Sequence, residues 1–245
     1  MKGTRIFYRS SGGLVSEQRL AETIEMVYLP LRLLPAVRSS VILGFQVMQP
    51  PHSSQPVLDV FLETGAYLKG HFRLTSGMHS PEYLQCAKVL QHPGLAERFG
   101  VALATQLREM DPEINVVVAP AMGGLIIGHE VARSLGCRFI FTERDSEGKM
   151  TLRRGFAINP GEHAVVIEDV ITTGGSSKEV VEILTREGAH VSGAGSIIDR
   201  SGGKADLGVP RVALAVLQVT AFQPENCPLC QEGLPVVKPG SRPTA

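Results

Sequence analysis

The sequence predicts an α/β fold in which a mostly parallel central sheet is flanked by helices. Between residues 114 and 219, short apolar runs rich in β-branched residues alternate with segments of helical periodicity, a pattern typical of repeated strand–helix–strand units. Polar or glycine-rich segments directly follow two of these runs. Because ligands of such sheets bind outside the carboxyl ends of the strands, we expect the functional site at those two strand ends.

Three elements are expected before the alternating region. The apolar residues of "VLDVFLET" fall on one helical face, and Gly65 is a plausible stop for this helix. The runs "HFRLTS" and "PEYLQCAKVL" flank a turn at Gly77 and predict a hairpin. A longer helix begins near Pro93.

The alternating region predicts five strands with helices between them. The expected strands are "INVVVAP", "CRFIFTER", "HAVVIED", "AHVSGAGSIID" and "RVALAVLQV". The expected helices are "GGLIIGHEVARSLG" and the segment from Gly175 to Arg186. Strands and helices of these lengths give a sheet covered by helices on both faces.

Composition excludes several classes of protein. Lys plus Arg and Asp plus Glu each total 24 in the 245 residues, so no overall charge attracts nucleic acid or an anionic membrane. Only 4 cysteines and no cleavable signal pattern favour a cytoplasmic protein. Charged residues and prolines interrupt the longest apolar region, residues 26–45, so no transmembrane helix is expected.

Residues 1–56 differ from the rest of the chain. They begin with glycines and basic residues and end in the linker-like "MQPPHSSQP". Glu17, Glu22 and Glu25 argue against a mitochondrial presequence. We expect a non-core extension; the alternative is that the working protein starts at Met48.

The stretch "AVVIEDVITTGGSS", residues 164–177, carries the strongest functional signal. Its apolar strand delivers Glu168 and Asp169 to the sheet edge, where carboxylates can accept hydrogen bonds from a diol. The glycines and hydroxyls that follow, at the start of a helix, suit a phosphate group. Taken separately, the acids could be solvated charges and "TTGGS" a helix cap. Together they favour a ribose phosphate ligand.

The same stretch resembles the phosphoribosyl-diphosphate signature of type I phosphoribosyltransferases, and "VVVAPAMGGLIIG" resembles that family's pyrophosphate loop. The resemblance implies a core of parallel strands with a small hood, and transfer of a 5-phosphoribosyl group to a nitrogen nucleophile. It also implies Mg²⁺ as cofactor, with no direct metal ligand from the protein. The phosphoribosyl-diphosphate contacts implied are Glu168, Asp169, Val170, Ile171, Thr172, Thr173, Gly174, Gly175 and Ser176. The pyrophosphate loop implied is Ala121, Met122, Gly123 and Gly124.

A second match, in "FLETGAYLKGHFRLTSGMHSPEYLQCAKVLQHP", resembles the hood of orotate phosphoribosyltransferases. With "SIIDRSGG", the resemblance extends from residue 57 to about 219. It implies Thr172, Arg200 and Tyr83 as orotate contacts, and the planar guanidinium of Arg200 suits a carboxylate. Leu84 stands where the family has a second aromatic residue. The implied domains are an extension (1–56), a phosphoribosyltransferase domain (57–225) with its hood (57–92), and a tail (226–245).

The sequence departs from the family at several basic positions. Thr75 and Gly123 replace lysines, and "ERDSEGKMTLRRGF" lacks the histidine of the family's mobile loop. Arg144 matches the first basic residue of that loop and Lys149 is the nearest candidate for a later lysine. With Asp169, these two are the implied catalytic residues. The resemblance further implies a homodimer in which this loop, as a lid, serves the neighbouring subunit.

Two other hypotheses come from the sequence. Cys227 and Cys230, in "CPLC", could be half of a zinc site, but the sequence shows no partners at metal-binding spacing, so none is expected. The alternative functions are a phosphoribosyltransferase for another nucleobase and a non-catalytic regulator that senses phosphoribosyl diphosphate.

Overall fold

The computed structural model describes residues 54–74 and 76–239. The expected extension up to residue 53, the alternative start at Met48 and the hood position Thr75 lie outside the described residues. Among those described, no helix is long and apolar enough to cross a membrane.

A six-stranded sheet forms the centre of the described chain, in the order β5-β4-β3-β6-β7-β8. Its strands are β3 (Val116–Pro120), β4 (Arg138–Arg144), β5 (Met150–Leu152), β6 (His163–Ile171), β7 (His190–Asp199) and β8 (Arg211–Val216). Every pairing is parallel except that of β4 with the edge strand β5. The predicted mostly parallel sheet is therefore confirmed.

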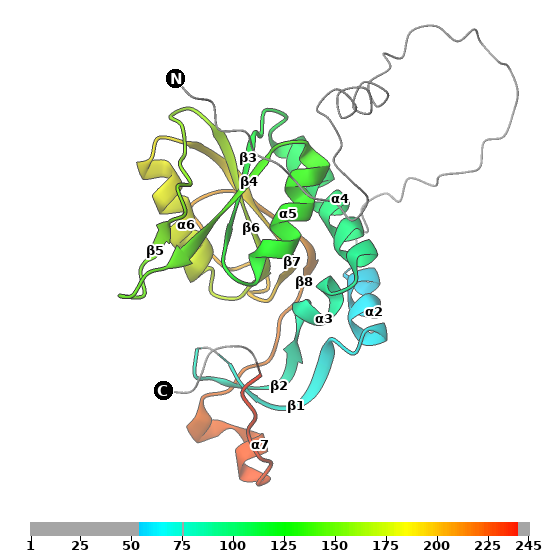
Figure 1. Ribbon diagram of the computed structural model, residues 1–245. Coiled ribbons are helices and arrows are strands. Elements are labelled where there is room, and N and C mark those ends of the chain that lie inside the picture. Colours follow the sequence, from blue (N-terminus) through cyan, green and yellow to red (C-terminus); the bar gives the residue numbers. More distant parts are fainter. Residues whose placement is uncertain (1–53, 75, 240–245) are drawn as a thin grey trace, which may run out of the picture. The chain divides into compact units, whose positions relative to one another are not determined.

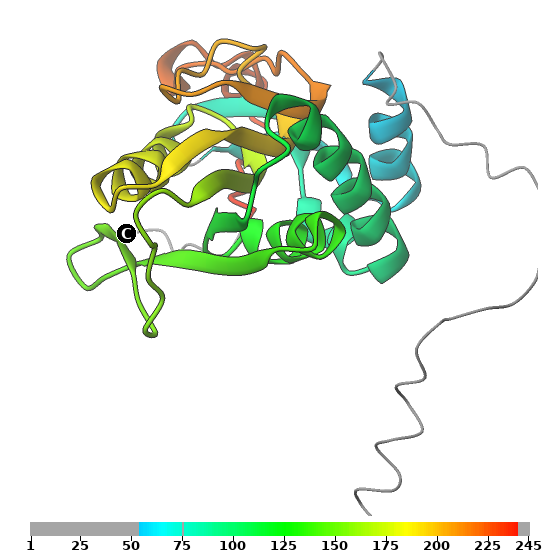
Figure 2. The ribbon, with the colours of Figure 1, turned by 90° about the horizontal axis from the view of Figure 1, so that it is seen from above.

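Helices cover both faces of this sheet (Figure 1). On one face lie α4 (Pro93–Met110) and α5 (Gly124–Leu135), and on the other lies α6 (Gly175–Arg186). The side chains of β6 alternate between two apolar cores: Val165 and Ile167 pack with α4 and α5, whereas Ala164 and Val166 pack with α6. The view from above shows the sheet between the two helical layers (Figure 2). Burial on both faces explains why these strands are continuous apolar runs.

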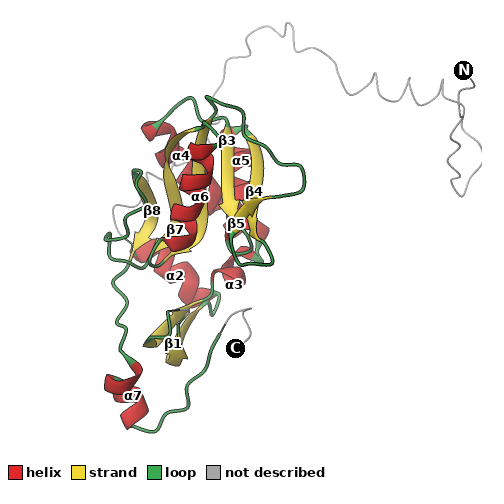
Figure 3. Ribbon diagram, turned by 90° about the vertical axis from the view of Figure 1, so that its left-hand side faces the viewer, coloured by secondary structure: helices red, strands yellow, loops and turns green. Residues whose placement is uncertain are grey.

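A smaller two-stranded antiparallel sheet precedes the large one in the chain. It consists of β1 (Tyr67–Arg73) and β2 (His79–Leu84) and is flanked by α2 (Gln55–Glu63) and α3 (Cys86–Leu90). Figure 3 shows the hairpin apart from the large sheet, near α2 and α3. The hairpin was predicted, but its second strand was expected to continue through "CAKVL", and this was wrong. These residues form a helix because Cys86, Val89 and Leu90 become buried at helical spacing.

The chain returns to the hairpin after β8. The backbone of Phe222 exchanges two hydrogen bonds with that of His79, at 2.8 Å each. Val237 accepts from the N–H of Arg73 and donates to the carbonyl of His71, also at 2.8 Å. The short helices η1 (Pro224–Asn226) and α7 (Pro228–Gln231) lie between these two contacts. The C-terminal segment thus pairs with both outer edges of the hairpin.

Helix α4 approaches α5 closely at Gly100. A Cβ atom there would lie 2.6 Å from Cβ of Glu130 and 2.8 Å from its carbonyl carbon. We therefore predict that Gly100→Ala lowers the free energy of unfolding by about 1–3 kcal/mol, a typical cost of overpacking. Urea denaturation measures this change. Gly94→Ala in the same helix is the control, since nothing lies within 4 Å of that position; equal effects of the two substitutions would refute the packing argument.

Candidate active site

The two strands whose carboxyl ends carry the predicted motifs are neighbours in the sheet. β3 and β6 pair in parallel, with Val116 opposite Ala164 and Val118 opposite Val166. The chain runs from β3 to β4 on one side and continues from β6 to β7 and β8 on the other. Strand order therefore reverses between β3 and β6, which is where sheets of this kind bind ligands.

The loop after β6 leads into an open helix N-terminus. Thr172 and Thr173 are exposed, and Gly174 has φ +82°, a conformation that favours glycine. A Cβ on Gly174 would lie 2.5 Å from Cδ2 of Leu207. No side chain caps α6, and its first backbone bond runs from the N–H of Lys178 to the carbonyl of Gly174. The preceding N–H groups have no partner within the helix and can bind an anion.

Glu168 and Asp169 leave β6 toward opposite faces of the sheet, because neighbouring strand residues alternate. The Glu168 carboxylate accepts a hydrogen bond from the hydroxyl of Ser177 in α6. The Asp169 carboxylate lies on the α5 side and accepts from the N–H of Val170 at 2.9 Å. Burial raises the pKa of Asp169. The two acids therefore flank the strand end and have different environments.

The predicted pyrophosphate loop packs directly against this strand end. The peptide bond between Ala121 and Met122 is cis, and the Met122 side chain is 74% exposed. A Cβ on Gly123 would lie 2.5 Å from Oδ1 of Asp169, and one on Gly124 would lie 2.7 Å from the carbonyl oxygen of Ile167. Only glycines allow this close approach, so the structure brings the two predicted loops together.

Arg200 enters the same site from the end of β7. Its N–H donates to the carbonyl of Ile171 at 2.8 Å, which fixes its backbone beside the end of β6. Its Nε is buried and has no hydrogen-bond partner among the described residues. Burial lowers the pKa of Arg200, whereas the nearby Tyr83, Cys86 and Glu82 raise it. The guanidinium therefore remains a cation with a free donor.

Tyr83 reaches this region from β2. Burial raises its pKa, the charge of Arg200 lowers it, and the charge of Asp169 raises it. The charges of Arg200 and Asp169 therefore both act on the Tyr83 phenol. These three residues, all of them predicted from the sequence, come from β2, from β6 and from the residue that follows β7.

Leu84, the neighbour of Tyr83, is buried in the apolar core. Leu84 therefore forms part of the support for the hairpin.

The implied lid residues lie on the hairpin between β4 and β5. Arg144 makes two hydrogen bonds to the carboxylate of Glu179 in α6, at 2.9 and 3.0 Å. Lys149 is exposed at the other end of a turn in which Asp145 accepts from its N–H at 2.9 Å. Arg154 pairs in the same bidentate way with Glu143. Of these basic side chains, Arg144 and Arg154 are neutralised by carboxylates.

Several contacts at the site were not predicted. Cys86 is buried beside Asp169, with its Sγ 3.9 Å from the Asp169 carbonyl oxygen. Ser177 binds Glu168 and Glu179 binds Arg144. Ser177 could have been found as a hydroxyl in the first turn of the predicted helix, but nothing local in the sequence marks Cys86 or Glu179.

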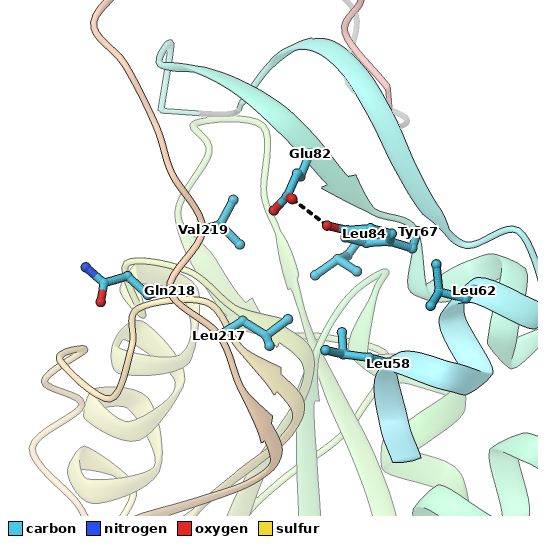
Figure 4. A pocket seen from close by; sticks show the side chains of 8 residues that line it. All are labelled: Leu58, Leu62, Tyr67, Glu82, Leu84, Leu217, Gln218 and Val219. Carbon is cyan, nitrogen blue, oxygen red and sulfur yellow. Dashed lines mark hydrogen bonds between the residues drawn. The ribbon is translucent and has the colours of Figure 1, made fainter. Parts of the chain in front are cut away.

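A cavity of about 200 Å³ lies beside the hairpin, between α2 and the segment after β8 (Figure 4). Its walls include Leu58, Leu62, Leu84 and Leu217. Its polar lining residues are Gln218, Glu82 and Tyr67, and the hydroxyl of Tyr67 donates to the Glu82 carboxylate. Burial and this acid raise the pKa of Tyr67 to about 12. None of the predicted site residues lines this cavity.

A parallel sheet with a strand-order switch, an acidic strand end and an open helix N-terminus is the arrangement that the resemblance to type I phosphoribosyltransferases implied. Comparison with known proteins agrees, since residues 87–207 match the model of the phosphoribosyl transferase domain family. Close relatives make the assignment more specific, and the chain belongs to the orotate phosphoribosyltransferase family.

Two such relatives are orotate phosphoribosyltransferases. The one from Desulforamulus reducens is 53% identical over 188 residues, covering 77% of this chain and 97% of the relative. The one from Pelotomaculum thermopropionicum is 54% identical over 186 residues, covering 76% and 96%. The crystal structure of orotate phosphoribosyltransferase from Aeropyrum pernix is similar with a TM-score of 0.57 at 26% identity, covering 66% of this chain and 94% of that one.

The contact between Gly123 and Asp169 can be tested directly. We predict that Gly123→Ala lowers phosphoribosyltransferase turnover at least about tenfold, because the loop or the carboxylate must move. Unfolding in urea should change much less, since Gly123 lies at the exposed edge of the sheet. Steady-state kinetics and urea denaturation measure the two effects, with Gly94→Ala as control. Full activity of Gly123→Ala would show that this close approach is dispensable.

Proposed function

We propose that this protein transfers the 5-phosphoribosyl group from phosphoribosyl diphosphate to orotate, forming orotidine 5'-phosphate and diphosphate in pyrimidine biosynthesis. The observation that carries the proposal is the buried, unpartnered Nε of Arg200 beside Tyr83. A planar guanidinium with a free donor binds a carboxylate well, and orotate is a nucleobase that carries one. An aromatic ring beside it offers a surface for the base.

Phosphoribosyl diphosphate fits the neighbouring loops. In this proposal the N–H groups at the start of α6 and the hydroxyls of Thr172, Thr173 and Ser176 bind the 5-phosphate. Asp169 and Glu168 hold the ribose hydroxyls from the two sides of the strand end. The backbone of the pyrophosphate loop, exposed at Gly123 and Gly124, lies beside the leaving diphosphate.

Mg²⁺ fits this donor set. The carboxylates of Glu168 and Asp169 are hard oxygen donors, and Mg²⁺ is commonly held by one or two carboxylates together with water and substrate phosphates. We expect substrate oxygens to supply most of its ligands, with these carboxylates nearby. When bound, the ion would neutralise charge on the diphosphate.

The protein's own residues then stabilise the charges that develop on the ribose and on the departing diphosphate. Departure of diphosphate leaves a cation-like ribose, which the carboxylate of Asp169 can stabilise. Lys149 is the better candidate to meet the departing diphosphate, because Arg144 is already paired with Glu179. For Arg144 to act in catalysis, this ion pair would have to open. Closure of the β4–β5 hairpin over the site would keep water away from the cation-like ribose.

The organisation proposed around this site is that of the family. Residues 57–92 form the hood, 57–225 the phosphoribosyltransferase domain, and 226–245 a tail that follows it.

We further propose that the protein is a cytoplasmic homodimer. In this dimer the hairpin between β4 and β5 would act as the lid over the site of the neighbouring subunit. Light scattering of the purified protein measures the dimer, and a monomeric active enzyme would contradict it.

The function itself is tested by following the ultraviolet absorbance of orotate with purified protein, phosphoribosyl diphosphate and Mg²⁺. Loss of absorbance that requires all components, with release of diphosphate, is the expected result. Binding of phosphoribosyl diphosphate without loss of orotate would instead point to another nucleobase or to a regulatory protein.

Arg200→Lys should weaken the binding of orotate and leave the binding of phosphoribosyl diphosphate nearly unchanged. A lysine keeps the charge but loses the planar pair of donors, and a hydrogen bond to a charged group contributes about 1.5–3 kcal/mol. We therefore predict that KM for orotate rises at least about tenfold, while KM for phosphoribosyl diphosphate changes little. Arg186→Lys on the exposed face of α6 is the control. Equal increases in both KM values would argue against a specific contact with orotate.

Asp169→Asn should lower turnover by about 10- to 100-fold, the kinetic equivalent of one charge-assisted hydrogen bond. The fold should persist because an asparagine oxygen can still accept from the N–H of Val170. Asp206→Asn is the matched control, since Asp206 also accepts a backbone hydrogen bond, from Gly208 at 3.0 Å, but is exposed elsewhere. Unchanged turnover of Asp169→Asn would remove this residue from the mechanism.

A further inference from the structure

Four potential metal ligands meet where the C-terminal segment crosses the hairpin. His71 lies on β1 and His79 begins β2, whereas Cys227 precedes α7 and Cys230 lies within it. One donor atom from each residue lies within 4.8 Å of all the others. Figure 3 shows α7 and the hairpin on the same side of the large sheet. This cluster was not predicted, because the two histidines precede the cysteines by more than 140 residues.

The spacing of the donor atoms suits one tetrahedral ion. His71 Nε2 lies 2.9 Å from His79 Nδ1 and 3.5 and 3.7 Å from the Sγ atoms of Cys227 and Cys230. Cys230 Sγ lies 3.3 Å from His79 Nδ1. Zinc bonds of about 2.0–2.1 Å to nitrogen and 2.3 Å to sulfur would place tetrahedral ligands about 3.3–3.8 Å apart. The observed distances therefore require only small movements.

The surroundings of His71 orient its ring for metal binding. Nδ1 of His71 lies 2.7 Å from the carbonyl oxygen of Leu234, so its proton is held by that carbonyl and Nε2 is left free to bind. Metal-binding histidines are commonly oriented by such a second hydrogen bond. His71, His79 and Cys227 are buried, and only Cys230 is exposed. Two imidazoles and two thiols, three of these side chains buried, therefore converge on one point from two distant parts of the chain.

We propose that His71, His79, Cys227 and Cys230 bind a structural zinc ion that fastens the C-terminal segment to the hairpin. Two nitrogen and two sulfur ligands in a tetrahedron favour zinc. With four protein ligands the site is closed, which is typical of structural rather than catalytic zinc. Binding requires both thiols to lose their protons, which are released to solvent.

The site has a consequence for the hairpin. β2 carries His79 at its first position and Tyr83 four residues later. An ion that holds His79 therefore fixes the strand that presents Tyr83 to the candidate active site. The zinc would act through the fold and would not touch the substrates.

Zinc content of the full-length protein, purified without a metal-affinity tag and gel-filtered, tests the proposal. Mass spectrometry of the metal should give about one zinc per chain. The double variant Cys227→Ser, Cys230→Ser should lose it, while the control Cys137→Ser should retain it, since Cys137 lies outside the cluster. These measurements need no substrate, so their outcome is independent of the proposed enzymatic function.

A second measurement covers the possibility that the double variant does not fold. Wild-type protein stripped of metal and loaded with Co²⁺ should show the thiolate charge-transfer and ligand-field bands of tetrahedral coordination. Absence of these bands, or zinc far below one per chain after growth with added zinc, would overturn the proposal. Equal zinc content in the double variant would also overturn it. In those cases the histidines are joined by a simple hydrogen bond.

Discussion

The site depends on how closely one loop backbone approaches the end of a neighbouring strand. Gly123 and Gly124 contact Asp169 and the Ile167 carbonyl at distances that exclude a Cβ atom. Parallel pairing of β3 with β6 brings these groups to the same edge of the sheet. A third glycine, Gly174, turns the chain after β6 so that α6 begins at this edge. The backbone around the acids is thus arranged before any ligand binds, which lowers the entropy cost of binding.

The buried guanidinium of Arg200 destabilises the free protein, and a bound ligand could remove this cost. Burying a guanidinium nitrogen without a hydrogen-bond partner destabilises the folded protein. The Nε of Arg200 is such a group, and it is held in place through the backbone bond to Ile171. A carboxylate bound there would remove the penalty. Binding of such a carboxylate would therefore be favoured by the free energy that the unpartnered Nε costs the free protein.

Most of the fold could be predicted from the sequence because its signals are local. The strand bearing Glu168 and Asp169, the helix from Gly175 to Arg186 and the hairpin at Gly77 each depend on nearby residues. The relationships that were missed depend on tertiary structure. Alternation along β6 places the two acids on opposite faces, but the groups that each acid meets, Ser177 for Glu168 and the loop at Gly123 for Asp169, depend on what packs on each face.

Long-range pairs also escaped prediction. The partner of Arg144, Glu179, lies on α6, two strands further along the chain, and no spacing in the sequence links the two residues. The same is true of the histidines and cysteines that meet at the hairpin, since only "CPLC" has a local pattern. The sequence therefore marked the motifs at the strand ends, but it did not mark the residues from distant elements that contact them.

The hairpin needs this long-range support because two strands alone are marginally stable. Its outer edges pair with Phe222 and Val237, and α2 packs against β1. In the proposed function, the loop that would bind the ribose phosphate follows a strand of the large sheet, whereas Tyr83 lies on the hairpin. Under that proposal, binding of the ribose phosphate and binding of the base are supported by different parts of the chain. Substitutions in the C-terminal segment should then weaken binding of the base more than binding of the ribose phosphate.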